Sequence, residues 1–232
     1  MGGEGNSMET DRIMVIMAHP DDAEMGSGGT IAKWIKEGNE VRYVVCTNGD
    51  KGTKDRELSP HRLAEIREEE QLKSANVLGV KSVTFLRHRD GELEVNLAFR
   101  GELALLIRQY KPHVIVTHDP WRPYLLHPDH RAVGFTTSDA VVASRDHLFL
   151  PAQTYVGFDA HSPREIHFTF PENPDLFVDI AETLDKKLEA IEQHKSQIEI
   201  HPDWKERMTG MAIEFGKKAN LQYAEIFKRV VL

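Results

Sequence analysis

The sequence predicts an α/β fold with a mostly parallel central sheet and an irregular C-terminal third. The main observation is an alternation, from Ile13 to about Phe158, of short β-rich apolar runs with longer amphipathic runs, which is typical of βα units. The second observation is size, because 232 residues with 40% hydrophobic and 28% charged residues have ordinary globular proportions. We therefore expect one large domain with one core.

Five strands and four helices make up the predicted alternation. The expected strands are Ile13–Ala18, Val41–Cys46, Ser82–Leu86, Val114–Thr117 and Thr154–Phe158. Between them, apolar residues recur at helical spacing and predict helices near Gly29–Glu37, Pro60–Leu78, Asn96–Tyr110 and His130–Ala143. Because open α/β folds bind ligands at the carboxyl ends of their strands, the loops that follow these strands are where we expect a site.

The last third of the chain is less regular. Glu165–Phe170 and Phe177–Ile180 are candidate strands, followed by helices from Glu182 to about Lys195 and from Asp203 to Gly216. The sequence shows no repeat and no long linker. We therefore predict a flexible Gly-rich tail over residues 1–11 and a single domain over residues 12–232.

Composition excludes several classes of partner. The formal net charge of -8 opposes binding to nucleic acid or to an anionic membrane surface. Charged or polar residues interrupt every apolar run before it reaches the roughly 18 to 20 residues that span a bilayer. The single cysteine, Cys46, lies in a predicted buried strand and has no partner for an internal disulfide. We therefore expect a cytoplasmic protein.

The loop after the first strand concentrates reactive side chains. In Ala18-His19-Pro20-Asp21-Asp22, one imidazole and two carboxylates stand within four residues at the carboxyl edge. A His and an Asp three residues apart can turn to one point, and the proline stiffens the chain between them. This favours metal ligation. The alternative is that one of the aspartates caps the helix that follows.

A second cluster, His127-Pro128-Asp129-His130, follows the fourth strand and belongs at the same edge. Two imidazoles and one carboxylate are a familiar set for catalytic zinc, which leaves a fourth position open. The remaining carboxylate and imidazole are then free for proton transfer. Taken alone, this cluster is more often a helix cap with surface histidines, but its pairing with the first cluster favours a metal site.

These motifs resemble the PIG-L/LmbE family of zinc-dependent N-acetylglucosaminyl deacetylases. The similarity covers most of the chain and extends through Gly26-Ser27-Gly28-Gly29-Thr30, Thr47-Asn48-Gly49-Asp50, Ile66-Arg67-Glu68-Glu69-Glu70 and His194-Lys195-Ser196-Gln197. The resemblance implies a Rossmann-like three-layer sandwich and hydrolysis of the N-acetyl amide of a small GlcNAc-containing substrate. It also implies a homo-oligomer, in some relatives a hexamer.

The resemblance implies a role for each motif residue. His19, Asp22 and His130 match the zinc ligands, and Asp21 matches the general base. Oxygen and imidazole ligands also accept Fe²⁺ and other divalent metals.

Four further residues receive predicted roles. His127 matches the histidine that faces the developing oxyanion, where a cationic imidazole would be a charged donor. Asp129 matches a residue that orients or tunes this histidine. Arg67 matches an arginine near the site and is predicted to bind substrate or to form a structural ion pair with Glu70. Arg122 lies in an aromatic loop that we predict to select the substrate or to contact another subunit.

Two other histidines are not predicted to take part in the chemistry. His118 follows the fourth strand and could support the site together with Asp119, but we interpret both as ordinary strand-end residues. His194 ends a predicted helix, where relatives make subunit contacts, and is placed outside the site.

Two other functions remain open at this point. One is an amidase that cleaves a thiol-cofactor conjugate with the same zinc site. The other is a metal-sensing or nucleotide-binding Rossmann-like module without catalysis. A sensor has no need of the spare Asp21 and His127, and the glycine-rich segment lacks the lysine of a phosphate-binding loop. Both points favour a hydrolase.

Overall fold

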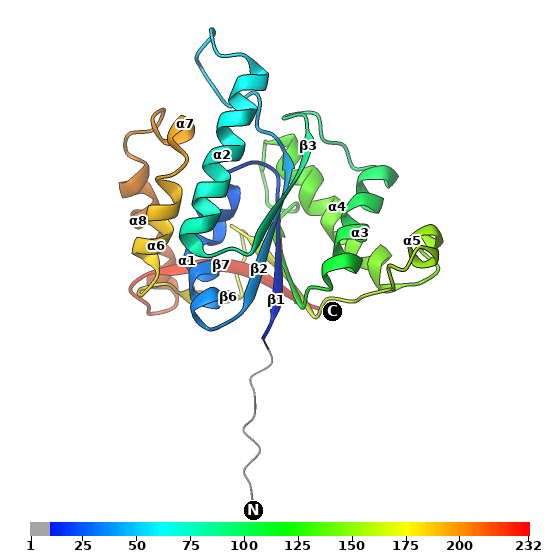
Figure 1. Cartoon of the computed structure of the whole chain (residues 1–232). Coiled ribbons are helices and arrows are strands. Elements are labelled where there is room, and N and C mark those ends of the chain that lie inside the picture. The colour runs from blue at the N-terminus through cyan, green and yellow to red at the C-terminus, as the bar shows by residue number, and fades with distance from the viewer. Residues whose placement is uncertain (1–9) are drawn as a thin grey trace, which may run out of the picture.

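A seven-stranded sheet forms the centre of the molecule in the computed structural model, which describes residues 10–232 (Figure 1). The strands are β1 Arg12–Met17, β2 Glu40–Thr47, β3 Ser82–His88, β4 Val114–His118, β5 Glu165–Thr169, β6 Leu176–Asp179 and β7 Ala224–Val231. Their order across the sheet is β3-β2-β1-β4-β5-β7-β6. The first five strands are parallel, and β7 pairs antiparallel with both β5 and β6.

Helices cover both faces of this sheet. They are α1 Asp22–Lys36, α2 Pro60–Leu78, α3 Leu97–Tyr110, α4 Pro128–Arg145, α5 Pro151–Tyr155, α6 Leu184–Ile191, α7 Lys195–Ile198 and α8 Trp204–Lys218. In Figure 1, α3, α4 and α5 lie on one side of the sheet, and the other five lie on the opposite side. The predicted three-layer α/β fold with a mostly parallel sheet is confirmed.

Strand β1 shows why the centre of the sheet is apolar throughout. Met14 and Ile16 pack into the core on the side of α3 and α4, whereas Ile13, Val15 and Met17 pack into the core on the other side. Successive side chains of a strand point to opposite faces, so a strand covered on both faces needs apolar residues at every position. This burial holds the carboxyl end of β1 in one place.

One predicted strand was wrong, one strand was missed, and one helix begins earlier than predicted. Thr154–Phe158 is not a strand, because Pro151 starts the short helix α5 and the fifth parallel strand is Glu165–Thr169. Strand β7 was not predicted. Helix α1 begins at Asp22 rather than near Gly29, and its glycine-rich part allows close packing: a Cβ at Gly29 would lie 2.8 Å from Ile180.

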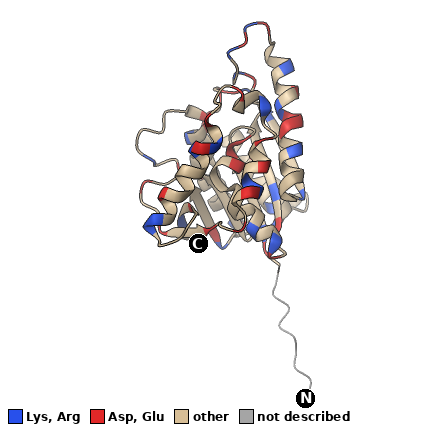
Figure 2. Cartoon of the chain, turned by 90° about the vertical axis from the view of Figure 1, so that its left-hand side faces the viewer, with Lys and Arg blue, Asp and Glu red and all other residues tan. Residues whose placement is uncertain are grey.

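The predicted tail over residues 1–11 lies outside the described residues except for its last two. Asp11 belongs to the folded part, because its carboxylate bonds His113 at 2.8 Å and also contacts Arg164. No helix among residues 10–232 is both long and apolar enough to cross a bilayer. On the face shown in Figure 2, Lys and Arg are interspersed with Asp and Glu along the helices.

A buried ion pair between α6 and β7 also contacts α1. Lys187 of α6 donates to Glu225 of β7 at 2.6 Å, and the two side chains are 5% and 3% exposed. The Glu225 carboxylate also accepts the amides of Gly29 and Thr30 in α1, at 3.0 and 2.7 Å. Lys187 additionally donates to the carbonyl of Met25 at 2.9 Å. One pair therefore joins α1, α6 and β7.

We expect Lys187→Met to lower the free energy of unfolding by about 3–5 kcal/mol, because it leaves the Glu225 carboxylate buried without its cation. Its neighbour Lys186 forms an exposed pair with Glu189, so Lys186→Met is a matched control that should cost about 0–1 kcal/mol. Urea denaturation measures both. Equal losses in the two variants would show that the buried pair contributes no more than an exposed one.

Candidate functional site

Three side chains converge where β1 and β4, which are adjacent in the sheet, reach their carboxyl ends. His19 follows β1, Asp22 begins α1, and His130 lies in the first turn of α4. His19 Nδ1 lies 3.2 Å from His130 Nε2 and 3.3 Å from Asp22 Oδ2, and His130 Nε2 lies 3.4 Å from Asp22 Oδ1. The predicted ligand set is therefore brought together.

The spacing of these three groups fits a divalent metal ion. A tetrahedral ion with metal–ligand bonds of about 2.1 Å holds its ligands about 3.4 Å apart, which is close to these three distances. Asp22 faces His19 with Oδ2 and His130 with Oδ1, so both of its oxygens point to the same place. The side chains around the triangle also favour a positive charge within it. Burial of His19 favours its neutral form, but hydrogen bonds to Asp129, Asp22 and Asp90 outweigh this and raise its pKa well above the usual value. A cation in the triangle offsets the same carboxylates.

The other ring nitrogen of His19 is held by two carboxylates. His19 Nε2 lies 3.2 Å from Asp129 Oδ2 and 3.2 Å from Asp90 Oδ1. Asp129 is fully buried and also accepts the amides of Gly91, at 2.6 Å, and Leu93, at 3.2 Å. Despite its burial, these hydrogen bonds lower the pKa of Asp129. A carboxylate at Nε2 keeps the proton there and leaves Nδ1 free to bind metal.

These contacts revise the predicted role of Asp129. Its carboxylate faces His19, whereas its main-chain amide donates to His127 Nδ1 at 3.3 Å. Asp129 thus orients His127 through the main chain. Asp90 was missed by the sequence analysis, although it follows β3 at the same edge of the parallel sheet and its position there is a usable signal.

Asp21 adopts an unusual backbone conformation beside the triangle. Its φ is +103°, and it precedes α1 without a side-chain capping bond, so the capping alternative for this residue does not hold. Its amide donates to Gln71 Oε1 at 2.9 Å, and Arg67 Nη2 lies 3.4 Å from its Oδ2. Burial raises the pKa of Asp21 against the opposing charge of Arg67. Such strain persists only where the surroundings enforce it, and it is common at active sites.

Asp22 differs from Asp21 in its electrostatic surroundings. Burial alone would raise its pKa, but His130 and His118 outweigh burial and hold the pKa well below the usual value. Its Oδ2 also accepts the amide of His19 at 2.8 Å. Asp22 is therefore held in its ionised form, as a metal ligand must be.

Arg67 stabilises the loop that carries Pro20 and Asp21. It is buried, and it donates to the carbonyls of Pro20 at 2.6 Å and Gly49 at 3.0 Å. A Cβ at Gly49 would lie 2.4 Å from Arg67 Nη1, so only glycine fits there. Glu70, the predicted ion-pair partner, instead accepts the amide and hydroxyl of Ser196. These contacts indicate that Arg67 positions Asp21. They do not support the predicted contact between Arg67 and substrate.

His118 belongs to the site, contrary to our interpretation of it as an ordinary strand-end residue. Its Nε2 lies 3.3 Å from Asp22 Oδ2 and accepts the amide of Ala18 at 3.1 Å. Its ring stacks on that of His130, with centroids 4.1 Å apart. Burial lowers the pKa of His118 to about 4, so the ring is neutral and can accept this bond. Because the amide occupies Nε2, His118 packs against the ligands rather than replacing one.

His194 also reaches the site, through buried side chains. It is fully buried, and its Nε2 lies 3.4 Å from Glu24 Oε2. Glu24 Oε1 accepts Gln71 Nε2 at 2.8 Å, and Gln71 holds the amide of Asp21. Because its side chain is buried within the chain, His194 does not make the predicted subunit contact. It lines no part of the cavity, and it connects to Asp21 only through Glu24 and Gln71. This connection could not be predicted, because His194 is far in sequence from the loop that carries Asp21.

A cavity of about 480 Å³ opens over the triangle. One part of its wall carries the polar groups Asp22, His118, His127 and His130. Met25, Arg122, Phe170, Arg207 and Met208 are among the other residues that line it. Its size suits a small organic ligand, and Arg122 lies where the sequence predicted a substrate contact.

Comparison with known proteins agrees with this geometry. The model of the PIG-L family, described as GlcNAc-PI de-N-acetylase, matches residues 14–141. A diacetylchitobiose deacetylase of Thermococcus kodakarensis is 36% identical over 219 residues, which cover 94% of this chain and 82% of the relative. The 1D-myo-inositol 2-acetamido-2-deoxy-alpha-D-glucopyranoside deacetylase of Mycobacteroides abscessus is 35% identical over 58% of this chain and 56% of its own length.

Solved structures extend the likeness to the whole fold. The N,N'-diacetylchitobiose deacetylase of Pyrococcus horikoshii superposes with a TM-score of 0.92 at 36% identity, over 96% of this chain and 85% of that one. The matched family region contains both metal-ligand clusters and Asp21. The chain therefore belongs to the PIG-L family of GlcNAc-PI de-N-acetylases.

Proposed function

We propose that this enzyme hydrolyses the N-acetyl amide of a small GlcNAc-containing substrate and releases the free amine and acetate. The observation that carries the proposal is the triangle of His19, Asp22 and His130, whose Asp22 and His130 line a cavity large enough for a sugar together with His127. Asp21 directly precedes Asp22 in the same loop. Deacetylases of GlcNAc-containing substrates among its relatives support the same reaction. A metal sensor would have no use for the two additional groups.

We propose zinc as the metal, held by His19, Asp22 and His130. Two imidazoles and one carboxylate are a usual donor set for catalytic zinc, and Fe²⁺ fits the same donors. When bound, zinc supplies Lewis acidity, which polarises an amide carbonyl and makes water more acidic. Metal analysis of the purified enzyme distinguishes the two ions.

Asp21 has the properties of a general base. Its raised pKa favours acceptance of a proton, and its strained backbone directs the carboxylate away from the capping position. It can take the proton of the attacking water and later give it to the leaving amine. Arg67, 3.4 Å away, holds the carboxylate in place.

We propose that His127 stabilises the developing oxyanion. Because its Nδ1 accepts the amide of Asp129, its proton lies on Nε2, and its ring lines the cavity. Burial, together with His19 and His130, lowers the pKa of His127. This favours a neutral donor over the cationic one expected from the sequence. A single donor of this kind is typically worth about 10²-fold in rate.

The test is release of amine from metal-reconstituted enzyme. The substrates are GlcNAc, diacetylchitobiose, GlcNAc-malate and GlcNAc-inositol, and hydrolysis of at least one is expected. If all four are inert while one metal ion is bound per chain, the N-acetylglucosaminide assignment fails. A thiol-cofactor conjugate with a larger acyl group is then the next substrate to assay.

Gln71 is expected to act on the reaction through Asp21. Gln71→Met leaves the Asp21 amide without its acceptor, so we expect kcat to fall about tenfold with little change in KM, as for the loss of a group that orients a catalyst. Gln153→Met is the matched control, since Gln153 also bonds through both ends of its amide but lies away from the cavity. Steady-state kinetics with metal analysis separates the two. A kcat loss shared by both variants would indicate general destabilisation.

We also propose that the chain forms a cytoplasmic homo-oligomer. The loop before His127 exposes Trp121, Tyr124 and Leu126, which are 60%, 94% and 83% exposed, and such exposed apolar groups often mark contacts between proteins. Cys46 is a free, buried thiol, which suits a reducing compartment.

A further inference from the structure

A short segment, residues 194–197, is fixed against the elements that surround Asp21. It runs from the end of α6 into α7, which lies beside α2 (Figure 1). Ser196 donates its amide and its hydroxyl to Glu70 of α2, at 2.8 and 2.6 Å. Gln197 donates to the carbonyl of Gly52, in the loop between β2 and α2, at 3.1 Å. These bonds hold the ring of His194 in one place.

His194 and Glu24 form a buried pair with few other partners. Both side chains are fully buried, and His194 Nε2 lies 3.4 Å from Glu24 Oε2. Burial favours the neutral ring, but Glu24, Asp21 and Glu70 outweigh it and raise the pKa of His194. Among residues 10–232, neither nitrogen of this ring has a closer hydrogen-bond partner, and Glu24 Oε2 has none either. Such groups cost stability when buried, so their presence here needs a functional reason.

The second oxygen of Glu24 determines how Gln71 is oriented. Glu24 Oε1 accepts Gln71 Nε2 at 2.8 Å, and Gln71 Oε1 accepts the amide of Asp21 at 2.9 Å. A glutamine side chain has one donor end and one acceptor end, so only one of its two orientations makes both bonds. His194 holds the Glu24 carboxylate from its other side. The main chain of Asp21, with its φ of +103°, therefore depends on all three side chains.

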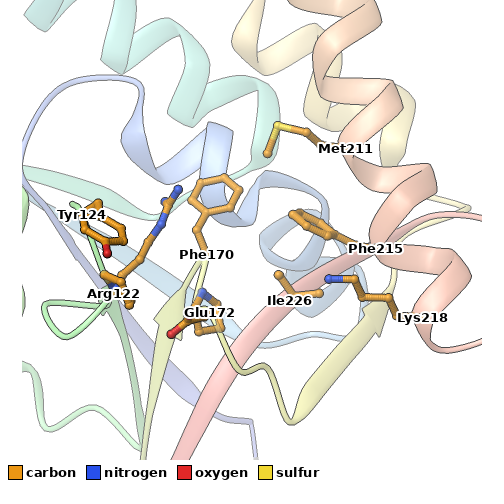
Figure 3. Close-up of a pocket in the computed structure, with 10 residues that line it drawn as sticks. Arg122, Tyr124, Phe170, Glu172, Met211, Phe215, Lys218 and Ile226 are labelled. Atoms are coloured by element: carbon orange, nitrogen blue, oxygen red, sulfur yellow. The ribbon is translucent and has the colours of Figure 1, made fainter. Parts of the chain in front are cut away.

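These three side chains do not reach the space that a substrate occupies. His194, Glu24 and Gln71 line neither the cavity over the triangle nor the neighbouring cavity beside α8 (Figure 3). Phe170 and Phe215 are among the residues that line the second cavity. An effect of His194 on the reaction must therefore pass through the protein and not through contact with substrate.

We propose that His194 is a positioning residue for the reaction: it holds the Glu24 carboxylate, which orients Gln71 and thereby fixes the main-chain amide of Asp21. The inference rests on the proposed deacetylase function, because that function makes Asp21 the general base. His194 itself exchanges no proton with the substrate. Its loss should therefore act on kcat, as the loss of Gln71 does, and leave binding of metal and substrate in place.

Steady-state kinetics on wild type, His194→Phe, Gln71→Met and the double variant test the proposal, with the one of the four N-acetylglucosaminides that wild type hydrolyses fastest. We expect His194→Phe to lower kcat about tenfold and to leave KM and metal content within about twofold. The double variant should lose no more than either single variant, because both substitutions break the same chain of contacts. An unchanged kcat in His194→Phe, or a loss of about 100-fold in the double variant, would overturn the proposal.

The matched control is His167→Phe. His167 is also a buried ring beside a carboxylate, with Nε2 2.8 Å from Glu165 Oε2 and no hydrogen-bond partner for Nδ1, but it lies in β5 and does not line the cavity over the triangle. Its replacement should lower the free energy of unfolding and leave kcat within about twofold. An equal loss of kcat in both histidine variants would show general destabilisation and contradict a positioning role.

Glu24→Gln makes the same test if His194→Phe does not fold. The shape at position 24 is kept, but the fixed acceptor for Gln71 is lost, so the same fall in kcat is expected, with no further loss when Gln71→Met is added. A Glu24→Gln variant with wild-type kcat would overturn the proposal.

Hydrogen exchange of the Asp21 amide, measured by NMR, gives a readout that needs no activity. Exchange should be about tenfold faster in His194→Phe and unchanged in His167→Phe. Unchanged exchange in His194→Phe contradicts the proposal whatever the kinetics show. If wild type with bound metal hydrolyses none of the four substrates while exchange responds as expected, the proposed function fails and the link from His194 to Asp21 stands.

Discussion

Replacement of Asp21 by Asn is expected to lower kcat about 10²–10⁴-fold while the metal stays bound. The amide has the same shape but cannot accept the proton of the attacking water. Asp21 lies outside the triangle of His19, Asp22 and His130, whose atoms are 3.2–3.4 Å apart without it. The loss should therefore fall on kcat and leave KM and metal content nearly unchanged.

Steady-state kinetics and metal analysis of the same sample make this measurement. Asp139→Asn, at an exposed position of α4, is the matched control and should behave as wild type. If Asp21→Asn retains more than a tenth of wild-type kcat with full metal content, another group takes the proton. Loss of metal in this variant would instead place Asp21 among the ligands.

His130→Ala is expected to abolish both stoichiometric metal binding and activity. Only His19 and Asp22 of the triangle remain, and two donors rarely hold a catalytic ion that three protein ligands normally bind. Zinc present at about 100 times its dissociation constant should stabilise wild type by about 2.7 kcal/mol, whereas the variant should gain almost nothing. Thermal unfolding with and without zinc, together with metal analysis after dialysis, gives both readings.

His147→Ala is the control for this substitution, because His147 is 75% exposed in its side chain. It should bind metal and unfold as wild type does. A His130→Ala variant that still holds one ion per chain would show that a different group binds it. The cluster of His19, Asp90 and Asp129 is then the candidate, because it is the one of three possible ligand clusters among the described residues that lacks His130.

The parallel half of the fold was predictable because its signals are local. Helix α2 has the predicted bounds, since Pro60 stands at its first turn and Gly79 ends it in the left-handed conformation. Strand β7 was not predictable in this way. It is buried in its first half and exposed in its second, around Lys228 and Arg229, so it shows neither a continuous apolar run nor strict alternation. Its place between β5 and β6 depends on partners distant in sequence.

The residues of the site also differ in whether local sequence patterns predict them. The two ligand clusters carry a compact pattern of His and Asp, and the structure brings together the three ligands predicted from it. Asp90 is a single carboxylate in a loop, and Gln71 and His194 act through buried contacts between remote segments. Such residues have no spacing that distinguishes them from surface residues. Their roles depend on tertiary contacts that local patterns do not encode.

The contact between Glu225 and α1 has a consequence for protein synthesis. Strand β7 leaves the ribosome after every other element of residues 10–232, yet its Glu225 anchors the amides of Gly29 and Thr30 in the helix that carries Asp22. Until β7 emerges, the edge of β5 is unpaired and prone to aggregate. A nascent chain is thus expected to be inactive and dependent on chaperones until β7 has left the ribosome.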